Sequence, residues 1–273
     1  MSLTSLDQLI TAMASSSAQN LYFAKSGKAS QATGGFSSSW NGSGSPGVGD
    51  PPAAAEIPTA ATAGALAFVN PGGGLTGYFS RVAVSSSVSG AAMRFYDRIA
   101  HMGGLVGNST AAQSVALSVT GSSNNLAARR GKADYSEVQW YLEWYTDTGS
   151  TAVTATVSYT NGDGVSGQTV AVSLGATMRS GRMLAIIPDN GDAIRSIESV
   201  TLSASTGTAG NFGVTAARLL VEAPTGLANT TFVHDWAALG LPIVPADSCI
   251  AIMFINPGNA GVNFTGSALL VTG

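Results

Sequence analysis

The clearest alternation of side chains in the chain runs over residues 138–145. Successive residues of a strand point to opposite faces. One face of this predicted strand carries four apolar residues, Val138, Trp140, Leu142 and Trp144. We expect that face to lie in the core. The other face carries Tyr141, Glu143 and Tyr145. It is a candidate interface face, because exposed aromatic rings stack on sugars or meet partner subunits; the alternative is that the same chain covers it.

Further short apolar or alternating segments recur at intervals of roughly 10 residues, as in β-sandwiches. They are residues 65–69, 78–84, 115–119, 152–159, 168–174, 182–187, 196–205, 212–221, 249–255 and 262–271. Residues 161–164 (Asn-Gly-Asp-Gly) predict a hairpin turn. Asn-Pro-Gly at 70–72 and 256–258 predicts two more turns between strands, each with a positive φ at the glycine. The pattern predicts an all-β fold with an antiparallel β-sandwich or jelly-roll-like body.

One short amphipathic helix is predicted at the start of the chain. Ser5 has the character of an N-cap, with Gln8 three residues later as in a capping box. Apolar residues then repeat at helical spacing: Leu6, Leu9, Ile10 and Met13.

The segment after this helix, up to about residue 58, is rich in Ser, Gly and Pro and carries scattered aromatic residues. We therefore expect two parts, a helix with an extended assembly arm over residues 1–62 and a β-sandwich body over residues 63–273. The arm would cross a neighbouring subunit through the apolar helix residues and the aromatic anchors Tyr22, Phe23, Phe36 and Trp40. The alternative is that these aromatic side chains fold back on their own body.

Charge is scarce, which changes the interpretation of the surface. Charged residues make up 10% of the 273 residues, against about 25% in ordinary soluble domains. A surface so short of charge favours coverage by neighbouring subunits and a homo-oligomer. The net charge of −3 and the scattered basic residues do not favour nucleic acid as a partner. We interpret the run from Arg129 to Lys132 as a solvated turn.

Candidate chemistry is sparse. The chain has two histidines, His101 and His234, and one cysteine, Cys249, set in an apolar run. No zinc-ligand spacing or nucleophile-elbow motif occurs. We therefore predict no catalytic residues, no metal site, no cofactor and no enzymatic activity, with Cys249 as a small buried apolar side chain. No stretch approaches the roughly 20 apolar residues of a membrane helix, so no membrane partner is expected.

Three longer strings carry a resemblance. They are residues 93–105 (MRFYDRIAHMGGL), residues 143–149 (EWYTDTG) with 154–159 (TATVSY), and residues 199–214 (SVTLSASTGTAGNFGV). In texture and in these strings the chain, over roughly residues 60 to 225, resembles proteins encoded among the structural genes of tailed bacteriophages. No catalytic signature is involved, and no functional residue follows from the likeness.

The resemblance implies a component of the virion, assembled in the host cytoplasm. The expected partners are other virion proteins, either the major capsid protein or neck and tail subunits. The leading hypothesis is a capsid decoration or minor capsid protein whose arm fastens neighbouring shell subunits. A neck, collar or tail adaptor or fibre-base subunit is the alternative within the virion. A carbohydrate-binding β-sandwich module is the alternative of another class, and it would use the face of Tyr141 and Tyr145.

Overall fold

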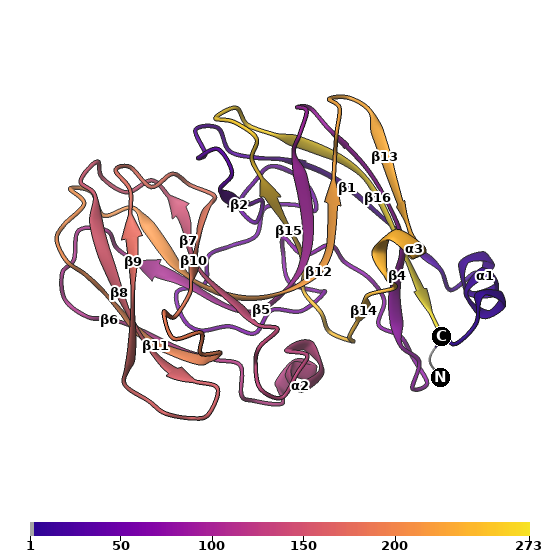
Figure 1. The fold of residues 1–273 in the computed structure, drawn as a ribbon, viewed down its shortest axis with the longest axis horizontal. Helices are drawn as coiled ribbons and strands as arrows, with labels where there is room; N and C mark the ends of the chain where they lie inside the picture. Colours follow the sequence, from indigo (N-terminus) through magenta and orange to yellow (C-terminus); the bar gives the residue numbers. More distant parts are fainter. Residues whose placement is uncertain (1–2) are drawn as a thin grey trace.

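The computed structural model describes residues 3–273 and is almost entirely β, with 44% of residues in strands and 7% in helices. Its strands form a six-stranded sheet, a closed barrel and a four-stranded sheet, all with antiparallel pairing. The barrel lies between the two sheets, which occupy opposite ends of the molecule (Figure 1). The all-β prediction is confirmed.

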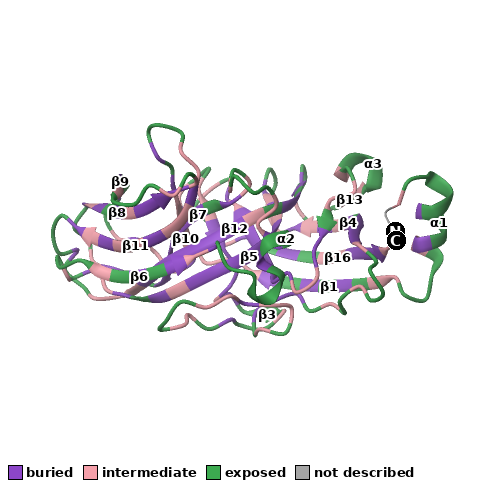
Figure 2. Cartoon of the chain, turned by 90° about the horizontal axis from the view of Figure 1, so that it is seen from below, coloured by how far each residue is buried: buried purple, intermediate pink, exposed green. Residues whose placement is uncertain are grey.

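The barrel strands close in the order β10 (Arg182–Ile186), β2 (Phe36–Ser38), β15 (Ile250–Ile255), β5 (Ala92–Leu105), β12 (Asn211–Pro224) and β7 (Gln139–Thr146). The two longest strands, β5 and β12, pair along most of their lengths. Buried residues run along both of them through the centre of the molecule (Figure 2). These two strands therefore contribute to both hydrophobic cores that flank the barrel.

The six-stranded sheet runs β13 (Thr231–Asp235), β4 (Gly77–Ser86), β16 (Asn263–Thr272), β1 (Gln19–Ser26) and β3 (Gly44–Ser45), with β14 (Ile243–Val244) also paired to β4. Its inner face packs on the barrel in a core that contains Phe79 and Phe264 from the sheet and Phe95 from β5. The ring of Phe95 stacks on Phe79 with centroids 5.4 Å apart. This core leaves the opposite face of the sheet uncovered by the barrel.

The four-stranded sheet runs β6 (Gln113–Ser118), β11 (Ile194–Leu202), β8 (Val153–Asn161) and β9 (Gln168–Leu174). The second core lies between this sheet and the barrel and includes Trp140, Leu142 and Trp144 of β7. Both tryptophans are buried, so the predicted core face of this strand is confirmed. The predicted hairpin is also present, because β8 pairs with β9 across the turn at 161–164.

The helices are short. They are α1 (Leu6–Ala14), α2 (Leu126–Arg129), which follows the 3-10 turn η1 (Ser123–Asn125), and α3 (Trp236–Leu239). Ser5 caps α1 as predicted, its side chain accepting from the Gln8 N–H at 3.3 Å. The reciprocal half of the capping box is displaced by one residue, since the Gln8 side chain accepts from the N–H of Thr4.

The two Asn-Pro-Gly segments differ from the prediction. Residues 65–69 form no strand, and the positive φ angles of the first turn fall on Gly73 and Gly74 rather than on Gly72. The second turn does not close a hairpin, because β15 belongs to the barrel whereas β16 belongs to the six-stranded sheet. Gly258 has no positive φ either. A local turn motif does not specify which sheet the next strand will join.

The division at residue 62 is also different from the structure. β1 pairs with β16 over eight residues, and β2 closes the barrel between β10 and β15. Residues 19–45 are thus built into the sheets that follow them in sequence, and residues 1 and 2 lie outside the described part. The interpretation in which the arm folds back on its own body describes this segment.

Candidate assembly surface

The uncovered face of the six-stranded sheet is formed by side chains that line up across four strands. Val233 of β13 pairs with Ala83 of β4. Ala83 pairs in turn with Ser267 of β16, and Ser267 pairs with Tyr22 of β1. Tyr22, Ala83 and Ser267 alternate with residues of the inner core and so point away from the barrel. Val233 lies in the same row as Ala83 and is exposed. We call this line the Tyr22–Val233 row.

The row and its neighbour carry no charge. The neighbouring row consists of Ala24, Thr265, Ser85 and Thr231. Tyr22 is 71% exposed and Val233 62% exposed, so two large side chains project from a surface of small residues. Charge appears only in the third row, at Arg81 and Asp235. An uncharged sheet face with projecting apolar side chains is typical of a surface that another protein covers.

Helix α1 adds a second apolar pair next to this face. Leu9 and Ala12 are buried against residues of β4 and β16, including Tyr78 and Leu269. Leu6 and Ile10, one helical turn apart, remain 52% and 56% exposed. One side of the helix is therefore packed on the sheet, and the other side is exposed and free to contact another protein.

The predicted arm contacts divide into two groups. Leu6, Ile10 and Tyr22 are exposed. Leu9, Phe23 and Trp40 are buried in the chain's own cores, and Met13 and Phe36 are partly buried against them. The expectation of eight contacts to a neighbour is wrong for the buried residues, because their side chains pack in the hydrophobic cores of the same chain. The three exposed side chains remain available.

The candidate interface face of Tyr141, Glu143 and Tyr145 is buried. These side chains have relative exposures of 3%, 1% and 4%. They point into the barrel, on the side of β7 opposite to Trp140 and Trp144. The prediction of an exposed face is wrong, since closure of the sheet into a barrel turns the second face of each strand inward.

Inside the barrel, Arg98 of β5 is the centre of a hydrogen-bond network. Its Nη2 donates to Glu143 Oε2 at 2.6 Å and to the Tyr145 hydroxyl at 2.8 Å. Its Nη1 donates to the Tyr96 hydroxyl at 3.2 Å, and its Nε to His101 Nδ1 at 2.9 Å. The guanidinium also lies over the ring of Trp40, 4.4 Å from the centroid. Glu143 additionally accepts from Thr215, so both charges are well compensated.

The environment of this network changes its proton affinities. Burial alone would lower the pKa of Arg98, but the Glu143 carboxylate raises it well above its ordinary value. Burial raises the pKa of Tyr96 to about 12. Burial, together with the charge of Arg98, lowers the pKa of His101 to about 2. At neutral pH the network thus holds one ion pair and a neutral imidazole.

A second buried ion pair joins segments that are distant in sequence. Arg129 Nη2 donates to Asp97 Oδ1 at 2.7 Å, and both side chains are fully buried. Asp97 also accepts from the Ser248 hydroxyl and from the N–H of Cys249. The interpretation of Arg129 as part of a solvated turn is therefore wrong. Sequence reasoning missed both networks, because their members lie on separate strands and loops with no motif spacing.

The remaining candidate groups form no metal cluster in residues 3–273. Cys249 is buried and free, as predicted. His101 Nε2 is buried without a hydrogen-bond partner, 3.8 Å from Glu56 Oε2. His234 Nε2 lies 3.1 Å from the Pro224 carbonyl oxygen. In this described part, no three His, Cys, Asp or Glu side chains gather as metal ligands, and none of its helices has the length and apolarity to span a membrane.

Comparison with known proteins gives little. No protein-family model matches the chain, and no curated protein matches its sequence. Among solved structures, the alignment with VP2 from the subviral particle of infectious bursal disease virus covers 93% of this chain and 80% of the VP2 chain. The identity is 12% and the TM-score is 0.19. The alignment with a mutant VP2 of the same virus covers 93% of this chain and 77% of the mutant VP2 chain, with 11% identity and a TM-score of 0.17. TM-scores this low do not establish a shared architecture.

Proposed function

We propose that this protein is a structural component of a virus particle, and more specifically a capsid decoration or minor capsid protein of a tailed phage. The observation that carries the proposal is the pair of uncharged rows on the outer face of the six-stranded sheet, with Tyr22 and Val233 projecting from it. Such a face suits contact with a second protein better than contact with water. Its occupant is another virion subunit, which is the major capsid protein or a further copy of this chain.

The placement of charge in the interior supports a structural role. Two ion pairs, Arg98 with Glu143 and Arg129 with Asp97, are sealed in the molecule with side-chain exposures of at most 1%. Their hydrogen bonds tie strands and loops together instead of facing solvent. The tailed-phage assignment itself rests on the resemblance of residues 93–105 and the other strings to phage structural proteins.

The surface that would contact neighbouring subunits is smaller than the arm expected from the sequence. Residues 19–45 are part of the body, so they do not reach across neighbours. We assign the contact to the Tyr22–Val233 row together with Leu6 and Ile10 of α1. A neck or tail position uses the same surface and differs in copy number. The carbohydrate-binding alternative loses its support, since the aromatic face on which it depended lies inside the barrel.

The direct test is the protein content of particles purified from the host that carries the gene. Quantitative mass spectrometry and cryo-electron microscopy should find the chain at a fixed number of copies on the head lattice. A small ring at one vertex would favour the neck position over decoration. Absence of the chain from purified, infectious particles would contradict the proposal as a whole.

A further inference from the structure

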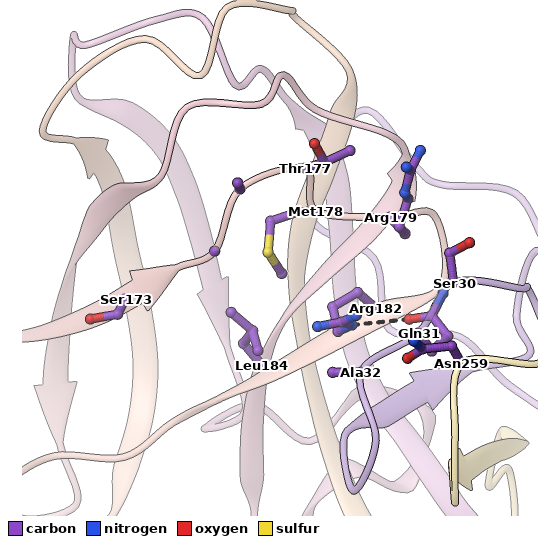
Figure 3. Close-up of a pocket in the computed structure, with 12 residues that line it drawn as sticks. Ser30, Gln31, Ala32, Ser173, Thr177, Met178, Arg179, Arg182, Leu184 and Asn259 are labelled. Carbon is purple, nitrogen blue, oxygen red and sulfur yellow. Dashed lines mark hydrogen bonds between the residues drawn. The ribbon is translucent and has the colours of Figure 1, made fainter.

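A polar cavity of about 480 Å³ lies where the four-stranded sheet meets the barrel (Figure 3), and no residue of the Tyr22–Val233 row lines it. Ser173 of β9, the loop 175–179 and the start of β10 form one side of it, and residues 30–32 with Asn259 form the other. Arg182, the first residue of β10, extends into this space beside Gln31 in the close-up. We call the cavity the Arg182 pocket.

The Arg182 side chain is held in place by neutral groups. Its Nε donates to Gln31 Oε1 at 3.0 Å. Gln31 is itself buried, and its Nε2 donates to the Ser180 carbonyl at 2.9 Å. The Arg182 guanidinium is therefore positioned by a fixed amide, which leaves the hydrogens on its two Nη atoms free to bond a ligand.

Arg182 has no acidic partner in the described part of the chain. Five other arginines form ion pairs with carboxylates: Arg94, Arg98, Arg129, Arg179 and Arg218. Arg182 forms none, although it is partly buried and burial lowers its pKa. A partly desolvated guanidinium gains most from a carboxylate, which accepts two parallel hydrogen bonds from it.

The surroundings of the pocket add positive charge. Arg179 also lines it, and its charge is balanced by Asp147 at 2.6 Å. Lys28 lies beside Gly181, so that a Cβ at Gly181 would approach the Lys28 side chain to 3.3 Å. Lys28 forms no ion pair within residues 3–273, although its charge helps to lower the pKa of Asp147. In a protein of net charge −3, this locally positive site is complementary to an anion.

A free strand edge borders the same pocket. β9 is the last strand of the four-stranded sheet and pairs only with β8. Residues 168–174 make no backbone hydrogen bond outside that ladder in the described chain. An exposed edge accepts an extended segment through main-chain hydrogen bonds. The adjoining pocket contains no aromatic residue on which a sugar ring would stack.

We propose that the Arg182 pocket receives the carboxylate of an Asp or Glu side chain carried by an extended segment of another protein chain. Arg182 is the anion ligand, and Gln31 is the positioning residue that fixes its guanidinium. The assignment of the segment to a protein of the particle rests on the proposed function. The affinity of the pocket for a carboxylate is independent of the proposed function.

The test is a titration of the isolated full-length chain with N-acetyl-glutamate amide, followed by the NMR signal of the Arg182 Nε–H. We expect a saturable shift of this signal, and no shift with N-acetyl-glutamine amide at the same concentrations. R182Q and R182K lack this signal, so their binding is followed through the backbone amide signals of residues 175–179, which line the pocket. R182Q should weaken binding by about tenfold or more, since a hydrogen bond to a charged group contributes at least that factor. R182K keeps the charge without the paired donors and should bind less tightly than the wild type.

R81Q is the matched control, because it removes an exposed arginine remote from the pocket and should leave binding unchanged. Absence of a saturable shift, or equal shifts with the glutamine analogue, would overturn the carboxylate site. Glucuronate binding at least about tenfold more tightly than N-acetyl-glutamate amide would overturn the protein segment as occupant and assign the pocket to an acidic sugar. Because the titration needs no particle, its outcome is independent of whether the chain enters one.

Discussion

The barrel interior and the outer face of the six-stranded sheet reverse the usual distribution of polarity. The interior holds the Arg98–Glu143 pair with its surrounding hydroxyl groups, all buried. The outer face presents two rows without charge, from which Tyr22 and Val233 project. In most soluble domains charge is placed outside and apolar area inside.

This difference separates two roles of polarity. A buried ion pair contributes little net stability, but loss of one partner is costly, which makes a single arrangement of strands strongly preferred. An uncharged outer face contributes nothing to the folded monomer and becomes favourable only when a partner removes it from water. We infer that the interior specifies the fold, whereas the outer face serves assembly.

The largest effect is expected from breaking the interior pair. Glu143→Gln is nearly isosteric and leaves the Arg98 guanidinium buried without a counter-charge. The free energy of unfolding should fall by about 3–5 kcal/mol, as measured by denaturant unfolding. Glu222→Gln is the control. The Glu222 side chain is 40% exposed and its partner Arg94 is 19% exposed, so this substitution should change the free energy of unfolding by about 1 kcal/mol or less. Equal small effects would remove the distinction between the two pairs.

The next effect concerns the two sides of α1. Leu9 is 2% exposed against β16 and β4, so Leu9→Ala should cost about 2–5 kcal/mol. Leu6 is half exposed on the same helix, and Leu6→Ala should change stability by about 0.5 kcal/mol or less. Thermal or chemical unfolding of both variants provides the comparison. Similar losses would mean that the helix is not anchored by one side only.

A smaller effect should appear in acid and involves His101. Burial holds its pKa near 2, against an ordinary value of 6.5. Over that interval the unfolded chain binds a proton that the folded chain excludes, so stability decreases as the pH falls below 6.5. We expect His101 to contribute a loss of about 3 kcal/mol between pH 7 and pH 4.

The measurement is the free energy of unfolding across this pH range in the wild type and in His101→Gln, which still offers an acceptor to Arg98. The variant should show a shallower decrease in acid. If the pH dependence of the free energy of unfolding were the same in both proteins, His101 would take up its proton over the same pH range in the folded and the unfolded chain.

Local signals in the sequence were sufficient for several elements. Alternation predicted the core face of β7, Asn-Gly-Asp-Gly predicted the β8–β9 hairpin, and Ser5 predicted the start of α1. Each depends on neighbours within a few residues. Such signals therefore predict elements, but they do not predict how the elements are assembled.

The interior of the barrel could not be predicted in this way. Arg98 and Glu143 are 45 residues apart, and Arg129 and Asp97 are 32 apart. Each pair meets only in the folded chain, and only Arg98 and Glu143 lie inside the barrel. Closure of the barrel also buries the face of β7 that carries Tyr141. The alternation of side chains along the strand indicates two faces, but it does not show that both become buried. The sequence predicts an arm over residues 19–45 because β1 and β2 take their partners from the distant strands β10, β15 and β16, and the short β3 pairs with β1.

The most direct test of the assembly role of the outer face compares stability and incorporation in one variant. Tyr22→Asp introduces a charge into the Tyr22–Val233 row at a side chain that is 71% exposed. The free energy of unfolding should change by about 0.5 kcal/mol or less, whereas the variant should be lost from purified particles in competition with the wild type. Arg81→Gln is the matched control, since it changes the charge by the same single unit in the row that already carries charge, and it should be incorporated nearly as well as the wild type. Incorporation of Tyr22→Asp at the wild-type level would contradict the account.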